Sequence, residues 1–239
     1  MLRPFWLLIG VLIAAFAGAG YWAASWPGFW PKHVTVSGNR VVSTAEILRR
    51  AAIAPDVNVW LQNARAAADR VAAIPYVDKA TVHRRLPADV LIEITERRPF
   101  AVMDFADGSA LVDRDLRVLQ PGRPGGEFPR LILRNASEPG AGTFLRARDA
   151  VRLRDDYVTL SAQHVAVETL RFYRFDELTA LSAGGVVLLL GDDADLSAKA
   201  ALVQPILSQA AIRGRKISLV DLRAPGTPVV RYEPAVKGE

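Results

Sequence analysis

Two strand-like segments follow each other in VDKATVHRRLPADVLIEITE, residues 77–96. In the second segment the apolar residues Val90, Ile92 and Ile94 occupy alternate positions, so one face is expected to be buried and the other half exposed. A Leu-Pro-Ala turn separates the segments. The stretch therefore predicts two strands, residues 77–84 and 89–96, joined by a turn.

A strand and two helices are expected before this pair. Residues 33–39, HVTVSGN, predict a short strand that ends in a Gly-Asn turn. Residues 43–46, STAE, have the pattern of a capping box, which opens a first helix. A second helix is predicted over residues 63–73 and is ended by Pro75. The order is β-α-α-β-β, and we assign it to a domain spanning residues 32–99.

An apolar segment precedes this domain. Residues 4–31 contain no charged side chain, and about 20 helical residues are enough to cross the hydrocarbon core of a bilayer. Aromatic residues, which favour the headgroup region, gather near its ends at Trp6, Tyr21, Trp22, Trp26 and Trp30. We predict a transmembrane helix over residues 5–26, with residues 1–4 in the cytoplasm and the body of the chain outside.

A cleaved signal peptide is the competing interpretation. Ala17-Gly18-Ala19 resembles a cleavage site, but the apolar stretch is longer than the usual h-region of about 7–15 residues. The uncleaved anchor is therefore favoured. The chain contains no cysteine, which excludes disulfides, thiolate metal sites and cysteine nucleophiles. Its net charge of +5 is spread along the chain without a basic run, which favours an ordinary solvated surface over a nucleic-acid site.

The second half of the chain alternates strands and helices. A hairpin is predicted at residues 100–112, and helices at residues 146–164 and 195–214, the latter with Ala198, Leu202, Ile206 and Ala210 on its apolar face. Further strands are expected at residues 168–175, 178–182, 186–190, 216–222 and 228–232. The predicted fold class is α+β, with a β-rich domain over residues 100–233, helices on one face of its sheet, and a tail at residues 234–239.

No catalytic or metal-binding pattern is visible. His33, His83 and His164 lack ligand spacing, and no serine lies in a nucleophile-elbow motif. The pairs Asp155-Asp156 and Asp192-Asp193 are interpreted as a solvated helix face and a turn, because neighbouring side chains point apart. We expect no enzyme activity and no cofactor.

The last predicted strand is a candidate binding edge. An edge strand presents unpaired N–H and C=O groups to a partner strand, and Val229, Val230, Arg231 and Tyr232 combine β-branched residues with an arginine and an aromatic residue. The alternative is that residues 233–239 cover this edge.

Several motifs resemble the FtsQ/DivIB family of bacterial cell-division proteins and its POTRA domain. Four lie in the family's order behind the apolar segment: VTVSGN (34–39), IPYV (74–77), ATVHRRLP (80–87) and LIEITERRP (91–99). Two more lie in the second half, DGSALVD (107–113) and ISLVDLRAPG (217–226). The chain departs from the family at Leu116, where glycine is common, and in its very short amino-terminal tail.

The resemblance implies a function in cell division. It implies a non-catalytic, single-pass inner-membrane protein that binds FtsB and FtsL, with Val229–Tyr232 pairing by β-augmentation and Arg223 supplying a salt bridge. POTRA domains dock proteins, so Val34, Thr35 and Val36 form a second candidate surface, together with a possible basic patch at His83, Arg84 and Arg85. The alternatives are a POTRA-bearing export or outer-membrane assembly component and a secreted enzyme.

Overall fold

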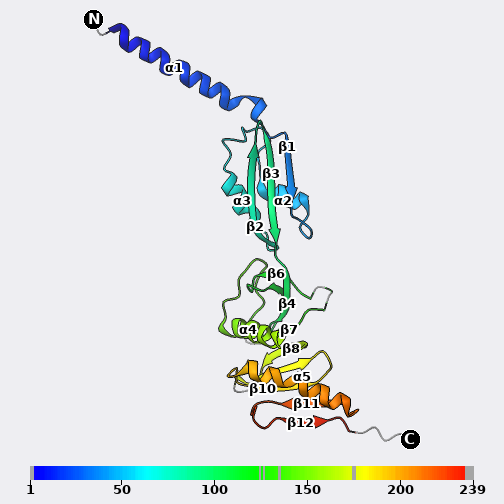
Figure 1. Cartoon of the computed structure of the whole chain (residues 1–239). Helices are drawn as coiled ribbons and strands as arrows, with labels where there is room; N and C mark the ends of the chain where they lie inside the picture. Colours follow the sequence, from blue (N-terminus) through cyan, green and yellow to red (C-terminus); the bar gives the residue numbers. More distant parts are fainter. Residues whose placement is uncertain (1–2, 124, 126, 134–135, 174–175, 235–239) are drawn as a thin grey trace. The chain divides into compact units, whose positions relative to one another are not determined.

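The computed structural model describes residues 3–123, 125, 127–133, 136–173 and 176–234 (Figure 1). The chain divides into two compact units, Met1–Arg97 and Arg98–Glu239. Each unit has its own hydrophobic core.

The first unit begins with a long exposed helix, α1, Arg3–Ser25. Its 23 residues rise over about 35 Å, and among the described residues it is the one helix long and apolar enough to cross a membrane. A 3₁₀ turn, η1, Pro27–Phe29, follows.

The rest of the first unit has the predicted β-α-α-β-β order. It comprises β1 (His33–Ser37), α2 (Thr44–Ala51), α3 (Ala64–Ala72), β2 (Val77–Arg85) and β3 (Asp89–Glu96). The sheet order is β1-β3-β2, with β1 parallel and β2 antiparallel to β3 (Figure 1). The turn between β2 and β3 therefore lies at the same end of the sheet as the start of β1.

Helices α2 and α3 both begin at a side-chain cap, and the cap at Ser43 is the one that the sequence predicts. The Ser43 hydroxyl accepts a hydrogen bond from the Glu46 amide at 3.2 Å, and the Asn63 side chain accepts one from the Ala66 amide at 3.0 Å. These bonds satisfy amides that have no partner within a helix. Alternate residues of β3, Val90 and Ile92, are fully buried against the helices, as their spacing predicts.

The second unit is built on a nine-stranded sheet. Its order is β12-β11-β10-β9-β8-β7-β4-β5-β6. The elements in chain order are β4 (Pro99–Asp104), β5 (Ser109–Asp113), β6 (Val118–Pro121), β7 (Arg130–Ile132), α4 (Arg148–Ala162), β8 (Val167–Phe172), β9 (Leu178–Ser182), β10 (Val187–Gly191), α5 (Leu196–Ile212), β11 (Ile217–Asp221) and β12 (Val229–Tyr232).

Helices α4 and α5 contact each other and pack on one face of this sheet, which confirms the predicted α+β class. Leu153 and Leu160 of α4 and Val203 of α5 share one core with strand residues such as Leu170 and Leu188. Strand residues on alternate positions, such as Leu181 and Leu189, are only half-buried.

The predicted apolar face of α5 is wrong in part. Ala198 is exposed, and Leu202 and Ile206 are only half-buried, whereas Ala210 is buried as expected. The helix is apolar almost all round, so periodicity does not single out one stripe. The buried side is instead formed by Leu196, Lys199, Ala200, Val203 and Ala210. Lys199 is tolerated because its ammonium lies 2.8 Å from the Asp192 carboxylate.

Leu116 adopts the left-handed conformation that favours glycine. Its φ is +62°, yet its side chain is only 1% exposed. The backbone penalty for a non-glycine residue there is about 1–2 kcal/mol. Full burial of a leucine is worth about 1.5–3 kcal/mol, which offsets it. The turn thus keeps the glycine-like backbone with a core side chain attached.

Candidate partner-binding surfaces

The predicted binding edge lies at one end of the nine-stranded sheet. Strand β12 has a single neighbour, β11, and pairs with it in antiparallel register, Val229 opposite Asp221 and Val230 opposite Val220. The other side of β12 is an open edge among the described residues. The terminal hairpin thus leaves the edge that the sequence predicts.

Backbone hydrogen bonds indicate which amides face the open side. The Glu233 amide donates to the Lys216 carbonyl at 2.9 Å, so it points toward β11. Because backbone groups alternate sides along a strand, Arg231 also faces β11 while Val230 and Tyr232 face outward. Leu222 donates to the Leu189 carbonyl of β10, which is consistent with this alternation. Two residues of β12 therefore offer donors and acceptors to an added strand.

The side chains of β12 divide between the two faces of the sheet. Val230 and Tyr232 pack against the core, whereas Val229 is 61% exposed and Arg231 is exposed. The Arg215 guanidinium stacks on the Tyr232 ring, with its carbon 3.4 Å from the ring centroid. The core contacts and this stacking hold β12 in place from one face.

Arg223 is engaged within its own chain. Its guanidinium donates to the Asp221 carboxylate at 2.7 Å and lies 3.7 Å from Glu177. The hydrogen bond from Arg223 lowers the pKa of Asp221 below its usual value. A partner carboxylate would have to share or replace these contacts. Of the residues expected to cover the edge, Glu233 and Pro234 are described, and 235–239 lie outside the described residues.

The predicted POTRA surface is divided in two. Val34 and Val36 of edge strand β1 pack against the core, while Thr35 lies exposed between them. His83 and Arg85 share one face of β2, and His83 lies 3.3 Å from the Glu93 carboxylate.

Arg84 faces the opposite side. Its guanidinium donates to the carbonyls of Trp60 at 3.0 Å and Gln62 at 3.2 Å. The three basic residues are therefore not brought together on one face, because adjacent positions of a strand point to opposite sides.

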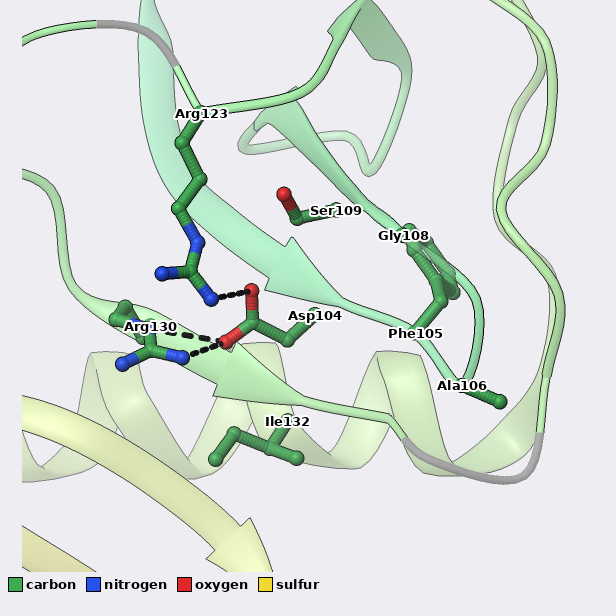
Figure 2. Close-up of a pocket in the computed structure, with 8 residues that line it drawn as sticks. All are labelled: Asp104, Phe105, Ala106, Gly108, Ser109, Arg123, Arg130 and Ile132. Atoms are coloured by element: carbon green, nitrogen blue, oxygen red, sulfur yellow. Dashed lines mark hydrogen bonds and ion pairs between the residues drawn. The ribbon is translucent and has the colours of Figure 1, made fainter.

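Sequence reasoning missed a polar hollow beside β4. Asp104, whose side chain is 9% exposed, accepts hydrogen bonds from Arg130 Nε at 2.9 Å and Arg123 Nη2 at 3.2 Å (Figure 2). These residues line a hollow of about 650 Å³ with Ser109, Gly108 and Ile132. The arginines follow Asp104 by 19 and 26 residues, so no local pattern links the three. Among the described residues, no group of His, Asp or Glu side chains is arranged to hold a metal ion.

The second missed residue is Asp156, which corrects the prediction of a solvated pair. Asp155 is exposed, but Asp156 is only 7% exposed, and its Oδ2 has no hydrogen-bond partner in the described part of the chain. Burial, with smaller contributions from Asp193 and Asp155 against Arg152, raises its pKa to about 6. Its position on the buried stripe with Leu153 and Leu160 was visible in the helical spacing.

Comparison with known proteins finds similarity to the FtsQ family of cell division proteins. A family model described as POTRA domain, FtsQ-type, matches residues 29–97. The cell division protein FtsQ of Mycobacterium tuberculosis is 34% identical over 110 residues, covering 45% of this chain. That match spans 35% of the relative, so the chain covers about a third of the mycobacterial protein's length.

Two relatives align over most of the chain. The cell division protein FtsQ of Zymomonas mobilis is 26% identical over 239 residues, which cover 93% of this chain and 72% of the relative. The cell division protein FtsQ of Novosphingobium aromaticivorans is 29% identical over 202 residues, which cover 84% of this chain and 61% of the relative. Both the POTRA-like unit and the larger sheet unit are therefore included in the similarity.

Proposed function

The chain belongs to the FtsQ/DivIB family of bacterial cell-division proteins, and on this basis we propose that it is a non-catalytic membrane component of the division machinery. Helix α1 anchors it in the inner membrane with the amino terminus in the cytoplasm. The POTRA domain, residues 32–99, and the β-rich domain, residues 100–233, lie in the periplasm. Its partners are FtsB and FtsL, and it helps assemble and regulate septum formation.

The open edge of β12 is the observation that carries this proposal. A partner strand from FtsB would pair with the outward-facing backbone groups of Val230 and Tyr232. Val229 and Arg231 would contact the partner from the face of the sheet opposite the core. Arg223, at the end of β11, would exchange part of its contact with Asp221 for a partner carboxylate.

The β1 edge at Val34, Thr35 and Val36 and, across the sheet, His83 and Arg85 on β2 provide two further proposed docking surfaces for division proteins. Arg84 enters this proposal only indirectly, because it holds the loop that contains Trp60.

The rival class is an export or outer-membrane assembly component. Such proteins carry tandem POTRA repeats before a membrane barrel. The family relationship extends over both units of this chain, which favours cell division.

The test is a pull-down of the full chain in detergent micelles against the extracytoplasmic segments of FtsB and FtsL from the same organism. We expect wild type to capture FtsB and Val230→Pro to lose it, since proline removes an outward-facing amide. Val230→Ala is the matched control, because it shortens the side chain and keeps the amide. Tyr232→Ala should weaken capture, because its ring packs against the core with Arg215 stacked on it and holds β12 in place.

Two outcomes would contradict the proposal at different levels. Capture of FtsB by Val230→Pro at wild-type strength would move the interface away from β12. No capture by the wild-type chain would overturn the proposed partners, and would favour the export component.

A further inference from the structure

The entry end of the POTRA domain carries an exposed apolar surface. Leu61 is 66% exposed, Leu86 is 75% exposed, and Val57 and Trp60 are 41% and 38% exposed. These residues come from two segments, the loop after α2 and the turn between β2 and β3. We call the four residues Val57, Trp60, Leu61 and Leu86 the apolar tip. Large side chains gathered this way in a soluble environment mark an interaction site.

The chain enters the domain from α1 at this same end. The Lys32 amide donates to the Ala88 carbonyl beside the β2–β3 turn at 3.1 Å, and His33 pairs with Asp89 at the start of β3. The Val59 amide donates to the Phe29 carbonyl at 2.9 Å. The connecting segment is therefore hydrogen-bonded to both parts of the apolar tip.

The connection to α1 is short. Helix α1 ends at Ser25 and β1 begins at His33, so residues 26–32 reach at most about 25 Å even when fully extended. Part of this segment is the compact turn η1, which shortens the reach further. With α1 across the membrane, the apolar tip is held close to the bilayer surface.

The apolar tip is held rigidly. The Trp60 indole donates to the Pro87 carbonyl at 3.2 Å, which joins the loop to the turn. The Gln62 amide group donates to the carbonyls of Ala54 and Val57, both at 2.9 Å, and closes the loop internally. The Arg84 guanidinium lies 5.4 Å from the Trp60 ring centroid. The backbone that carries the exposed side chains is thus held in place by hydrogen bonds, which lowers the cost of ordering it on binding.

Charges around the apolar tip suit a lipid surface. The basic residues near the apolar tip, in the chain or in the fold, are Lys32, Arg84 and Arg85. The acidic residues near it are Asp56 and Asp89, and the Asp89 carboxylate lies 3.0 Å from the His33 imidazole. A tryptophan beside aliphatic residues and basic residues is the composition that favours the interfacial region of a bilayer.

We propose that the apolar tip is inserted into the outer headgroup region of the membrane that α1 crosses, with Leu61 and Leu86 contacting lipid. The POTRA domain is then oriented by two attachments, the helix and this tip. The inference rests on α1 as a membrane anchor and does not depend on FtsB or FtsL.

The test uses single spin labels on the full chain in nanodiscs. The natural chain has no cysteine, so Leu61→Cys and Leu86→Cys each give one labelling site. Val41→Cys is the matched control, because Val41 is 65% exposed at the far end of the domain, where its amide bonds to Glu96. Ile13→Cys in α1 reports whether the helix lies in lipid. Accessibility to oxygen, which enters lipid, is compared with accessibility to a water-soluble nickel chelate.

We expect the oxygen-to-nickel ratio at positions 61 and 86 to be several-fold higher than at 41 and lower than at 13. A ratio at 61 and 86 equal to that at 41 would overturn the proposal while leaving the anchor intact. A low ratio at 13 would overturn the anchor and the proposal together. If positions 61 and 86 were shielded from both reagents, the apolar tip would contact a second copy of the chain and not lipid, and the proposal would be overturned.

Discussion

The two units shift the pKa of a carboxyl group in opposite directions. In the first unit, Glu96 accepts hydrogen bonds from the amides of Arg40, Val41 and Val42 at 2.8–3.0 Å. Burial alone would raise its pKa, but these amides lower it below its usual value. In the second unit, burial raises the pKa of Asp156 to about 6. Hydrogen-bond donors, and not burial alone, decide whether the fold prefers the charged or the neutral form of a half-buried or buried acid.

The pH dependence of stability should therefore differ in sign between the units. The lowered pKa of Glu96 gives stability that is present above its unfolded value and lost as the pH falls. The raised pKa of Asp156 means that the folded state holds a proton more tightly, so its effect destabilises the fold as the pH rises from about 4 to about 6.

The largest effect is expected where a buried acid loses its partner. Asp104 is as deeply buried as Asp156 but is paired with Arg130 and Arg123. Arg130→Ala should destabilise the second unit by about 3 kcal/mol, because it leaves a poorly compensated buried charge. Urea unfolding of the detergent-solubilised chain measures this. Arg123→Ala is the control and should cost less, since Arg123 is 57% exposed and, among the described residues, donates one hydrogen bond to Asp104. Equal losses of unfolding free energy in the two variants would show that the burial of the arginine does not decide how much it stabilises the unit.

Glu96→Ala should come next, with a loss of about 2 kcal/mol, because three amides lose a charged acceptor and water reaches part of the site. The difference from wild type should stay constant above the unfolded pKa of 4.5 and shrink as the pH falls below it. Glu93→Ala is the control on the same strand, since Glu93 is half exposed and contacts only His83 among the contacts described for it. A pH-independent difference would contradict the amide-acceptor account of Glu96.

Asp156→Asn should stabilise the second unit. A pKa raised by roughly two units, at about 1.4 kcal/mol each, sets an upper limit of about 3 kcal/mol on the gain at pH 7. We expect about 1–2 kcal/mol, because the asparagine amide must also be buried, and no gain below pH 4, where both states are protonated. Thermal unfolding at pH 4, 5.5 and 7 measures this. Asp155→Asn, on the neighbouring exposed position, should show no such pH dependence. A loss of stability at pH 7 would mean that the Asp156 carboxylate is satisfied as an anion.

The smallest effect on stability is expected at the surface pair of Arg223 and Asp221. Arg223→Ala should leave the melting temperature unchanged, because exposed ion pairs contribute little. Capture of FtsB should nevertheless weaken. Unchanged capture of FtsB would show that Arg223 is not part of the interface, which would then consist of the β12 edge alone.

Local patterns predicted most of the elements. The cap at Ser43, the alternation in β3 and the hairpin around Asp107-Gly108 are short-range features, so the sequence alone located them. The buried face of α5 was predicted only in part, because an almost uniformly apolar helix has no apolar stripe that stands out. The basic residues 83–85 were predicted as one patch, although strand geometry separates Arg84 from the other two.

The candidate site divides in the same way. The identity of Val229–Tyr232 as a terminal strand follows from its composition, and the family motifs along the chain follow from the sequence as well. That β12 lies at the end of nine strands depends on the pairing order. The partners of Asp104, the burial of Asp156 and the joining of Trp60 to Pro87 also required the tertiary structure.

The sequence by itself determined the apolar N-terminal helix, the β-α-α-β-β order, the α+β class and the resemblance to the FtsQ/DivIB family, because each depends on residue type and spacing within short segments. Only the tertiary structure decided the order of the nine strands, which of the described acids are paired and which apolar side chains gather at the entry to the POTRA domain. Those features join residues tens of positions apart, and their energies depend on burial and on hydrogen-bond geometry that no local pattern encodes.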